Sequence, residues 1–167
     1  MRLETHTSES QTNPLDNVED VLDSNNWVFS RLSDEELMVS VSGKHCDYRL
    51  FFIWQKDLEA LQFCCQYDMN ISDINMVSAA KVLMHINEGL WMGHFDIPQD
   101  TKCPSFRHTC LMRGLNLSDI HDHIEDLVDI SLAQCERSYS MFHFLCESKV
   151  ANDQIMSLAL METSGEA

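Results

Sequence analysis

The sequence predicts an α+β fold with a twisted, mainly antiparallel sheet of about five to six strands packed by helices. Residues 58–69 alternate apolar and polar side chains, the pattern of a strand that is covered on one face. Residues 48–55 are apolar on both faces, which predicts a strand inside the sheet. The connections between the expected strands are short, which favours antiparallel pairing. The predicted element order is α-β-β-β-β-α-β-β-α-α.

The first half of the chain is expected to form one helix and four strands. Asn13 is suited to cap the helix and Pro14 to occupy its first turn, and apolar residues then recur at helical spacing to about residue 23. An acidic turn at residues 33–35 separates the first two strands. The four strands are expected at residues 27–29, 37–42, 48–55 and 58–69.

The second half is expected to hold three helices and two strands. A helix over residues 72–90 is followed by strands at 93–97 and 106–113, a long helix capped by Ser118, and a short helix over 153–161. Near one face of the 72–90 helix lie Met76, Val77, Ala80, Leu83, Met84, Asn87, Leu90 and Trp91. The apolar stripe of the long helix comprises Ile120, Ile124, Leu127, Val128, Leu132, Cys135, Tyr139, Phe142 and Leu145.

The charge of the chain is strongly negative and lies mostly near its two ends. The formal net charge is −16; residues 1–26 carry six acids against one base, and residues 118–167 carry ten acids against two bases. A basic stripe, which phosphate neutralisation requires, is absent. We therefore expect neither nucleic acid nor an anionic membrane surface as a partner.

The chain is expected to be one cytoplasmic domain. Residues 1–12 are polar and predict a disordered tail, and residues 13–167 are long enough to form a single domain with its own core. No signal-peptide pattern follows Met1, and no window approaches the ~18–20 apolar residues of a membrane span. In the cytosol the seven cysteines would be reduced thiols.

The histidine and cysteine clusters do not predict a metal site or a cofactor. His121 and His123 are two residues apart on a helix, so their side chains point in different directions. Cys64 and Cys65 are neighbours on a strand and should face opposite sides of the sheet. The pair Cys103 and Cys110 lacks the second CxxC-like pair of a zinc knuckle.

His94 and Asp96 are the best acid–base candidates. On an extended segment they lie on the same side, where the carboxylate could orient the imidazole. Sheet surfaces commonly carry such polar pairs, and the chain has no glycine-rich phosphate loop, GxSxG or HExxH motif. An enzyme is therefore not expected.

Methionines and aromatic residues indicate a binding surface. The chain has ten methionines, whose flexible side chains adapt to varied apolar partners. Met76, Met84 and Met141 fall on helical stripes that we expect to be core. The partner-contact residues that we expect are Met38, Met69, Trp91, Met92, Phe95 and Met112.

Several landmarks extend along nearly the whole chain. They are Asn13-Pro14-Leu15, Trp27, Cys46-Asp47-Tyr48-Arg49-Leu50, Leu61-Gln62-Phe63-Cys64, Asn87-Glu88-Gly89-Leu90-Trp91, Gly93-His94-Phe95-Asp96 and Gly165-Glu166-Ala167. With these landmarks the chain resembles the YbjN-domain family, described as regulators of bacterial sensory transduction. The resemblance implies a fold similar to type III secretion chaperones, which are small, acidic and usually dimeric. The resemblance assigns no catalytic residues to this chain.

These observations together predict a non-enzymatic, protein-binding regulator or chaperone-like protein of the bacterial cytosol, acting through an apolar surface of a homodimer. The alternative is a small-molecule sensor or cryptic enzyme with a pocket near His94 and Asp96. A deep pocket with convergent polar groups would favour the alternative, and a shallow apolar patch would favour the binding protein.

Overall fold

Six antiparallel strands form one sheet in the order β1-β2-β3-β4-β6-β5. The computed structural model describes residues 13–149 and 157. The strands are β1 (Phe29–Ser33), β2 (Glu36–Ser42), β3 (Asp47–Gln55), β4 (Ala60–Tyr67), β5 (His94–Asp96) and β6 (Ser105–Leu111). The predicted α+β class and the antiparallel sheet are confirmed, and β3 lies inside the sheet as its two apolar faces predicted.

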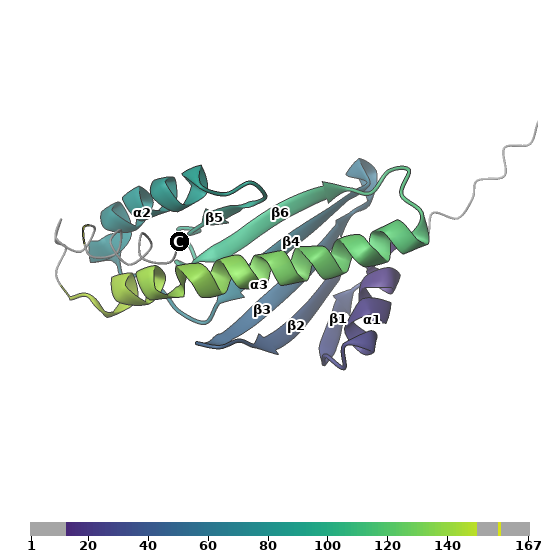
Figure 1. Cartoon of the computed structure of the whole chain (residues 1–167), viewed down its shortest axis with the longest axis horizontal. Helices are drawn as coiled ribbons and strands as arrows, with labels where there is room; N and C mark the ends of the chain where they lie inside the picture. Colours follow the sequence, from purple (N-terminus) through teal and green to yellow (C-terminus); the bar gives the residue numbers. More distant parts are fainter. Residues whose placement is uncertain (1–12, 150–156, 158–167) are drawn as a thin grey trace, which may run out of the picture.

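Two of the three α-helices found within residues 13–149 cover one face of the sheet. Figure 1 shows α3 (Leu117–Glu147) running across the strands, with α1 (Pro14–Ser24) beside its first half. The third helix, α2 (Met76–Glu88), lies at one end of the sheet, where it contacts β5 and α3. Short 3₁₀ turns precede β4 (η1, Lys56–Leu58) and α2 (η2, Asp73–Asn75).

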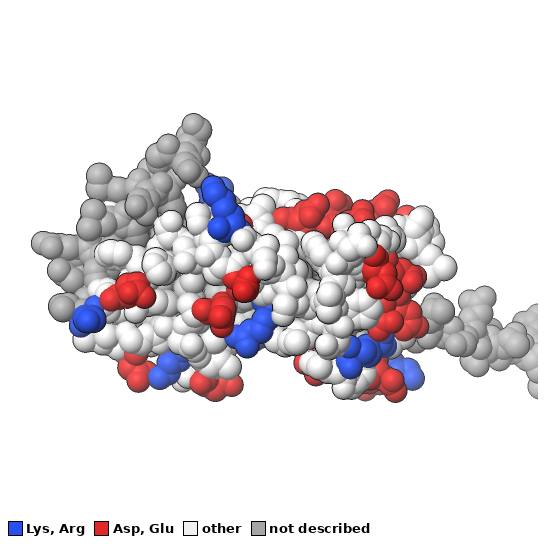
Figure 2. Space-filling view, turned by 90° about the horizontal axis from the view of Figure 1, so that it is seen from below, with Lys and Arg blue, Asp and Glu red and all other residues white. Residues whose placement is uncertain are grey.

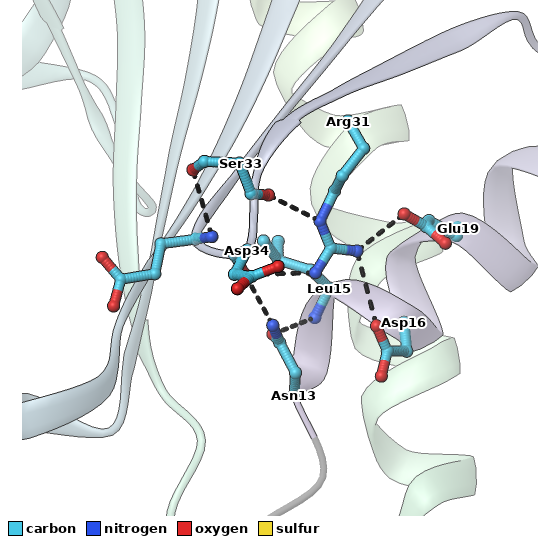
Figure 3. A network of polar contacts seen from close by, with 8 residues as sticks. Asn13, Leu15, Asp16, Glu19, Arg31, Ser33 and Asp34 are labelled. Carbon is cyan, nitrogen blue, oxygen red and sulfur yellow. Dashed lines mark hydrogen bonds and ion pairs between the residues drawn. The ribbon is translucent and has the colours of Figure 1, made fainter.

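The start of α1 is held by a polar network that also fixes the β1–β2 turn (Figure 3). Asn13 caps the helix as predicted, because its Oδ1 accepts a hydrogen bond from the Leu15 amide at 3.0 Å. The Arg31 guanidinium lies 2.6 Å from a Glu19 carboxylate oxygen, and its Nε donates to the Ser33 carbonyl at 2.8 Å. One arginine thus joins the helix, the strand and the turn.

The core lies between the sheet and α3 and follows the strand alternation. On β4 the side chains of Leu61, Phe63, Cys65 and Tyr67 are buried, whereas Gln62, Cys64 and Gln66 are half-buried on the other face. Tyr67 also links the two layers, because its hydroxyl donates a 2.6 Å hydrogen bond to the Cys135 carbonyl of α3. The alternation on residues 58–69 therefore predicted the buried face correctly.

Several boundaries differ from the sequence prediction. The first strand begins at Phe29 rather than Trp27, and β5 has only three residues. The cap of α3 is Asn116, whose Oδ1 accepts from the Asp119 amide at 3.0 Å, and not Ser118. The tail 1–12 and the short helix expected over 153–161 lie outside the described residues, apart from residue 157 in a helical conformation. Within the described part, no helix is long and apolar enough to span a bilayer.

Candidate functional site

Large apolar side chains project into solvent along α2 and beside its two ends. Ile74, Val77, Met84 and Trp91 are 53%, 72%, 76% and 75% exposed, and we call these four residues the α2 surface. Val77 and Met84 are seven residues apart and so lie on one side of the helix. Large apolar side chains exposed near one another are unusual on a monomer and mark interaction sites.

The sequence prediction placed the helical part of this surface in the core, and that prediction was wrong. Val77 and Met84 were expected near the buried face, but the buried side chains of α2 are Ala79 and Val82. Trp91, which was expected to contact a partner, is exposed. The reason is the way the helix docks. The Asn87 side chain pairs with both backbone groups of Phe95 on β5, at 2.7 and 3.0 Å, and this contact helps to set which side of the helix faces inward.

A second apolar area lies on the sheet face opposite α1 and α3. Met38, Phe51 and Cys64 are aligned across β2, β3 and β4, and Ile53 lies next to Phe51 on the same face. All four side chains are half-buried, and we call them the sheet surface. Phe51 and Ile53 belong to the two-sided apolar pattern of residues 48–55, and Met38 and Cys64 come from the neighbouring strands.

The six predicted partner-contact residues do not form one surface. Trp91 is exposed and belongs to the α2 surface, and Met38 belongs to the sheet surface. Met69 and Met92 are partly buried against the core. Phe95 and Met112 are buried, so the expectation that they face a partner is wrong for this structure. Phe95 packs against Phe106 and Phe142 with ring centroids 5.5 and 5.3 Å apart, because its strand position turns it inward.

His94 and Asp96 lie on the same side of β5, but they do not form a catalytic pair. The Asp96 carboxylate is paired with the Arg107 Nε on β6 at 3.3 Å. His94 is exposed and faces Arg107 across the strand pair. Among the hydrogen bonds of the described residues, none joins His94 to Asp96. A carboxylate held by a guanidinium does not orient the imidazole, as general-base chemistry would require.

Two hollows flank α3, and neither is lined by His94 or Asp96. The first, about 200 Å³, is the α2–α3 hollow, lined by His85, Ile86, Gly89, Leu90, Gln134, Arg137 and Ser138. The second, about 260 Å³, lies between α1 and α3 and is lined by Val21, Asn25, Trp27, Glu125, Val128 and Asp129. The α2–α3 hollow contains one of the chain's few cationic side chains.

The thiols are placed for packing rather than for reaction. Cys65 and Cys64 face opposite sides of the sheet as predicted. Cys65 lies in the core with its Sγ 3.5 Å from the Sγ of Cys135, and the hydrogen bond between these thiols together with burial raises the pKa of Cys65. Because the thiolate is the reactive and metal-binding form, a raised pKa makes Cys65 inert. Cys103 and Cys110 are both buried.

The histidines are likewise distributed without a metal-like cluster. Burial lowers the pKa of His108, and the charges of His123 and His94 lower it further. His123 therefore has a histidine neighbour from β6, a proximity that the sequence did not predict. Within residues 13–149, no group of three or more His, Cys, Asp or Glu side chains is arranged to hold a metal ion.

The turn between β2 and β3 is clamped onto α3 by contacts that the sequence did not predict. Glu136 Oε1 accepts a hydrogen bond from the Lys44 amide at 2.7 Å. The rings of His45 and Tyr139 stack with centroids 4.9 Å apart. Gly43 is required here, since a Cβ at that position would collide with Glu136 Oε1 and the Tyr48 ring. Lys44 and Glu136 are 92 residues apart, so no local pattern signals this contact.

Acidic side chains gather toward the end of the molecule where α1 and the start of α3 lie (Figure 2). The acids of these two segments are Asp16, Glu19, Asp20, Asp23, Asp119, Asp122, Glu125, Asp126 and Asp129. Such a surface repels a phosphate backbone, in keeping with the expected absence of nucleic-acid binding.

Comparison with known proteins places the chain in a family. A crystal structure described as "YbjN, a putative transcription regulator from E. coli" matches with a TM-score of 0.47 and 13% sequence identity, covering 73% of this chain and 90% of that chain. A comparison with curated protein sequences gives no match. The family model of YbjN, "putative bacterial sensory transduction regulator", matches residues 14–144. Because this match spans most of the chain, the protein belongs to the YbjN family.

Proposed function

We propose that the protein is a non-enzymatic regulator of the bacterial cytosol that works, in a chaperone-like manner, by binding another protein through the α2 surface. The observation that carries the proposal is the exposure of Ile74, Val77, Met84 and Trp91 along α2 and beside its two ends. Membership of a family of regulators agrees with such a role. The Asp96–Arg107 ion pair and the position of the two hollows do not favour the alternative, a sensor or enzyme at His94 and Asp96.

The α2 surface offers enough apolar area to drive binding. Burying one large apolar side chain contributes about 1.5–3 kcal/mol, so four such side chains supply several kcal/mol before the costs of association. Trp91 and Met84 are suited to this role, since tryptophan dominates many interface centres and methionine adapts its shape to different partners. An apolar segment of the partner would complete the surface.

The negative charge indicates how a regulator of this kind would act. The similar E. coli structure is described as a transcription regulator, but a net charge of −16 opposes direct contact with DNA. If this protein influences transcription, the route that its charge favours is the binding of another protein. An acidic surface also speeds association with a basic partner.

We further propose that the protein is a homodimer and that the sheet surface forms the dimer interface. Met38, Phe51, Ile53 and Cys64 make an apolar centre on an otherwise polar sheet face. Arg49, Gln62 and Gln66 lie around this centre on the same face and would form a polar rim. An apolar centre with a polar rim is the usual organisation of a protein interface. Pairing through this face would leave the α2 surface free for the partner.

The test compares proteins captured from native cytosol by tagged wild type and by a Val77→Ser/Met84→Ser variant, with identification by mass spectrometry. The matched control is Leu32→Ser/Leu117→Ser, which removes two exposed apolar side chains from other elements. We expect a protein that wild type and control retain and the α2 variant loses. Circular dichroism checks that all three are folded. Capture of the same proteins by all three would refute the role of the α2 surface.

A further inference from the structure

We propose that the α2–α3 hollow binds a small oxyanion, a phosphate or a carboxylate, with Arg137 as its main contact. This site is separate from the α2 surface, and it goes beyond the proposed function because protein binding there needs no ligand in the hollow. The proposal rests on three properties of the hollow. Polar groups without protein partners line it, Arg137 makes no ion pair among the described residues although the other four arginines there do, and the space has the size of a small anion.

The polar side chains of the hollow are unpaired. His85, Gln134, Arg137 and Ser138 line it, and within the described part of the chain none of these side chains makes a hydrogen bond or an ion pair. His85 and Arg137 are exposed, Gln134 is half-buried, and Ser138 is 4% exposed beside them. The exposed donors of the hollow are therefore open to an anion from solution and are not engaged by the described part of the protein.

Arg137 differs from the other arginines of the structure. Arg31, Arg49, Arg107 and Arg113 lie 2.6, 3.8, 3.3 and 3.3 Å from a carboxylate oxygen. Arg137 is the fifth arginine of the described residues and has no such partner there. In a protein with a net charge of −16, an arginine without a carboxylate partner is unexpected, because acids outnumber bases by 27 to 11. Its charge therefore remains available to an anion from solution.

The neighbouring carboxylate does not neutralise the hollow. Glu136 precedes Arg137 on α3, but its Oε1 accepts from the Lys44 amide and its Oε2 lies 3.7 Å from His45 Nε2, both on the β2–β3 turn. The five acids of the first half of α3 end at Asp129, two helical turns before Arg137. Arg137 thus lies in the part of α3 with the least negative charge.

The size and chemistry of the hollow select a compact ligand. A volume of about 200 Å³ is below the 300–1,000 Å³ of typical ligand pockets, which favours a phosphate or a small carboxylate over a nucleotide. A guanidinium binds two oxygens of such an anion in a forked arrangement. The Gln134 amide, the Ser138 hydroxyl and the His85 ring can add donors to the remaining oxygens.

The experiment is an NMR titration of the full-length ¹⁵N-labelled protein with sodium phosphate and, separately, sodium succinate. Sodium chloride at matched ionic strength controls for screening of charges. We expect saturable shifts of the Arg137 Nε–Hε and Gly89 amide signals at millimolar concentration or below. Arg137→Gln should weaken this binding at least about tenfold, because it removes a charged hydrogen-bonding group.

A matched control and a second variant keep the test decisive. Arg113→Gln removes the same charge from an exposed arginine outside the hollow and should leave the affinity unchanged. Ser138→Ala should weaken binding while the thermal melt confirms an intact fold. Saturation by phosphate alone assigns a phosphoryl ligand, and saturation by succinate alone assigns a carboxylate. Shifts that grow linearly with either salt, or that persist unchanged in Arg137→Gln, would overturn the proposal.

Discussion

Replacing Leu127 by alanine should destabilise the protein strongly, because Leu127 fills the layer between α3 and the sheet. Its side chain is 1% exposed and lies on the buried stripe of α3. The change removes three carbon atoms, worth about 0.8 kcal/mol each or about 2.4 kcal/mol together. The void left behind adds roughly 1–2 kcal/mol at about 24 cal/mol per Å³. We expect a loss of about 3–4 kcal/mol in the free energy of unfolding.

Urea denaturation of the variant and wild type measures this loss directly, and the midpoint of thermal unfolding should fall by roughly 10 °C for a chain of this length. Leu117→Ala is the matched control, because Leu117 is on the same helix but is 61% exposed. Its effect should stay within about 0.5 kcal/mol. Equal effects of the two substitutions would show that α3 does not pack on the sheet through the stripe described here.

Four further predictions follow from the same structure. His94→Ala should change the free energy of unfolding by no more than about 0.5 kcal/mol in urea, because His94 is an exposed residue of β5; a larger loss would place it in a buried network. Analytical ultracentrifugation at micromolar concentration should give twice the monomer mass of 19.3 kDa, and a mass near 19.3 kDa throughout would argue against the homodimer. EDTA and dithiothreitol should leave the melting temperature within about a degree, since loss of a structural metal would remove several kcal/mol. Burial raises the pKa of Cys110 and Cys146 from 9.0 to about 11, so the unfolded chain loses these protons at lower pH than the folded one. The melting temperature should therefore be insensitive to these thiols below pH 9 and fall between pH 9 and 11, and Cys110→Ala/Cys146→Ala should reduce that fall.

The strands could be predicted from sequence because their pattern and their environment agree. On β4 every second residue is apolar, and a sheet covered on one face buries every second residue. On β3 both faces are apolar because one lies on the core and the other forms the sheet surface. On β4 the period of two leaves only one way to assign the faces, so its buried face followed from the sequence.

The buried face of α2 could not be predicted in the same way, because the helix is apolar on more than half of its circumference. Val77 and Met84 are as hydrophobic as Val82 and Leu83, so hydrophobicity alone does not identify the inner face. The contact of Asn87 with Phe95, which helps to set it, is made by a polar side chain with a strand backbone.

The arrangement at Arg137 was also beyond a sequence prediction. His85 and Gln134 are 49 residues apart in the chain and meet only because α2 packs against α3. No motif joins them, and a single arginine on a helix has no signature. What distinguishes Arg137 is that it makes no ion pair with a carboxylate among the described residues, and that is a property of the folded chain.

The two outer strands of the sheet bear on whether further chains can add to its edges. Exposed strand edges are templates on which further chains can add, and long flat edges lead to fibrils. Here β5 has only three residues, and β1 has five residues with an irregular register between Arg31 and Ser33. Neither edge offers a long regular row of free amide and carbonyl groups. Two chains that associate through their sheet faces form a closed dimer, whereas strands added at the edges could continue without limit. The short, irregular edges therefore favour a closed dimer over open-ended growth.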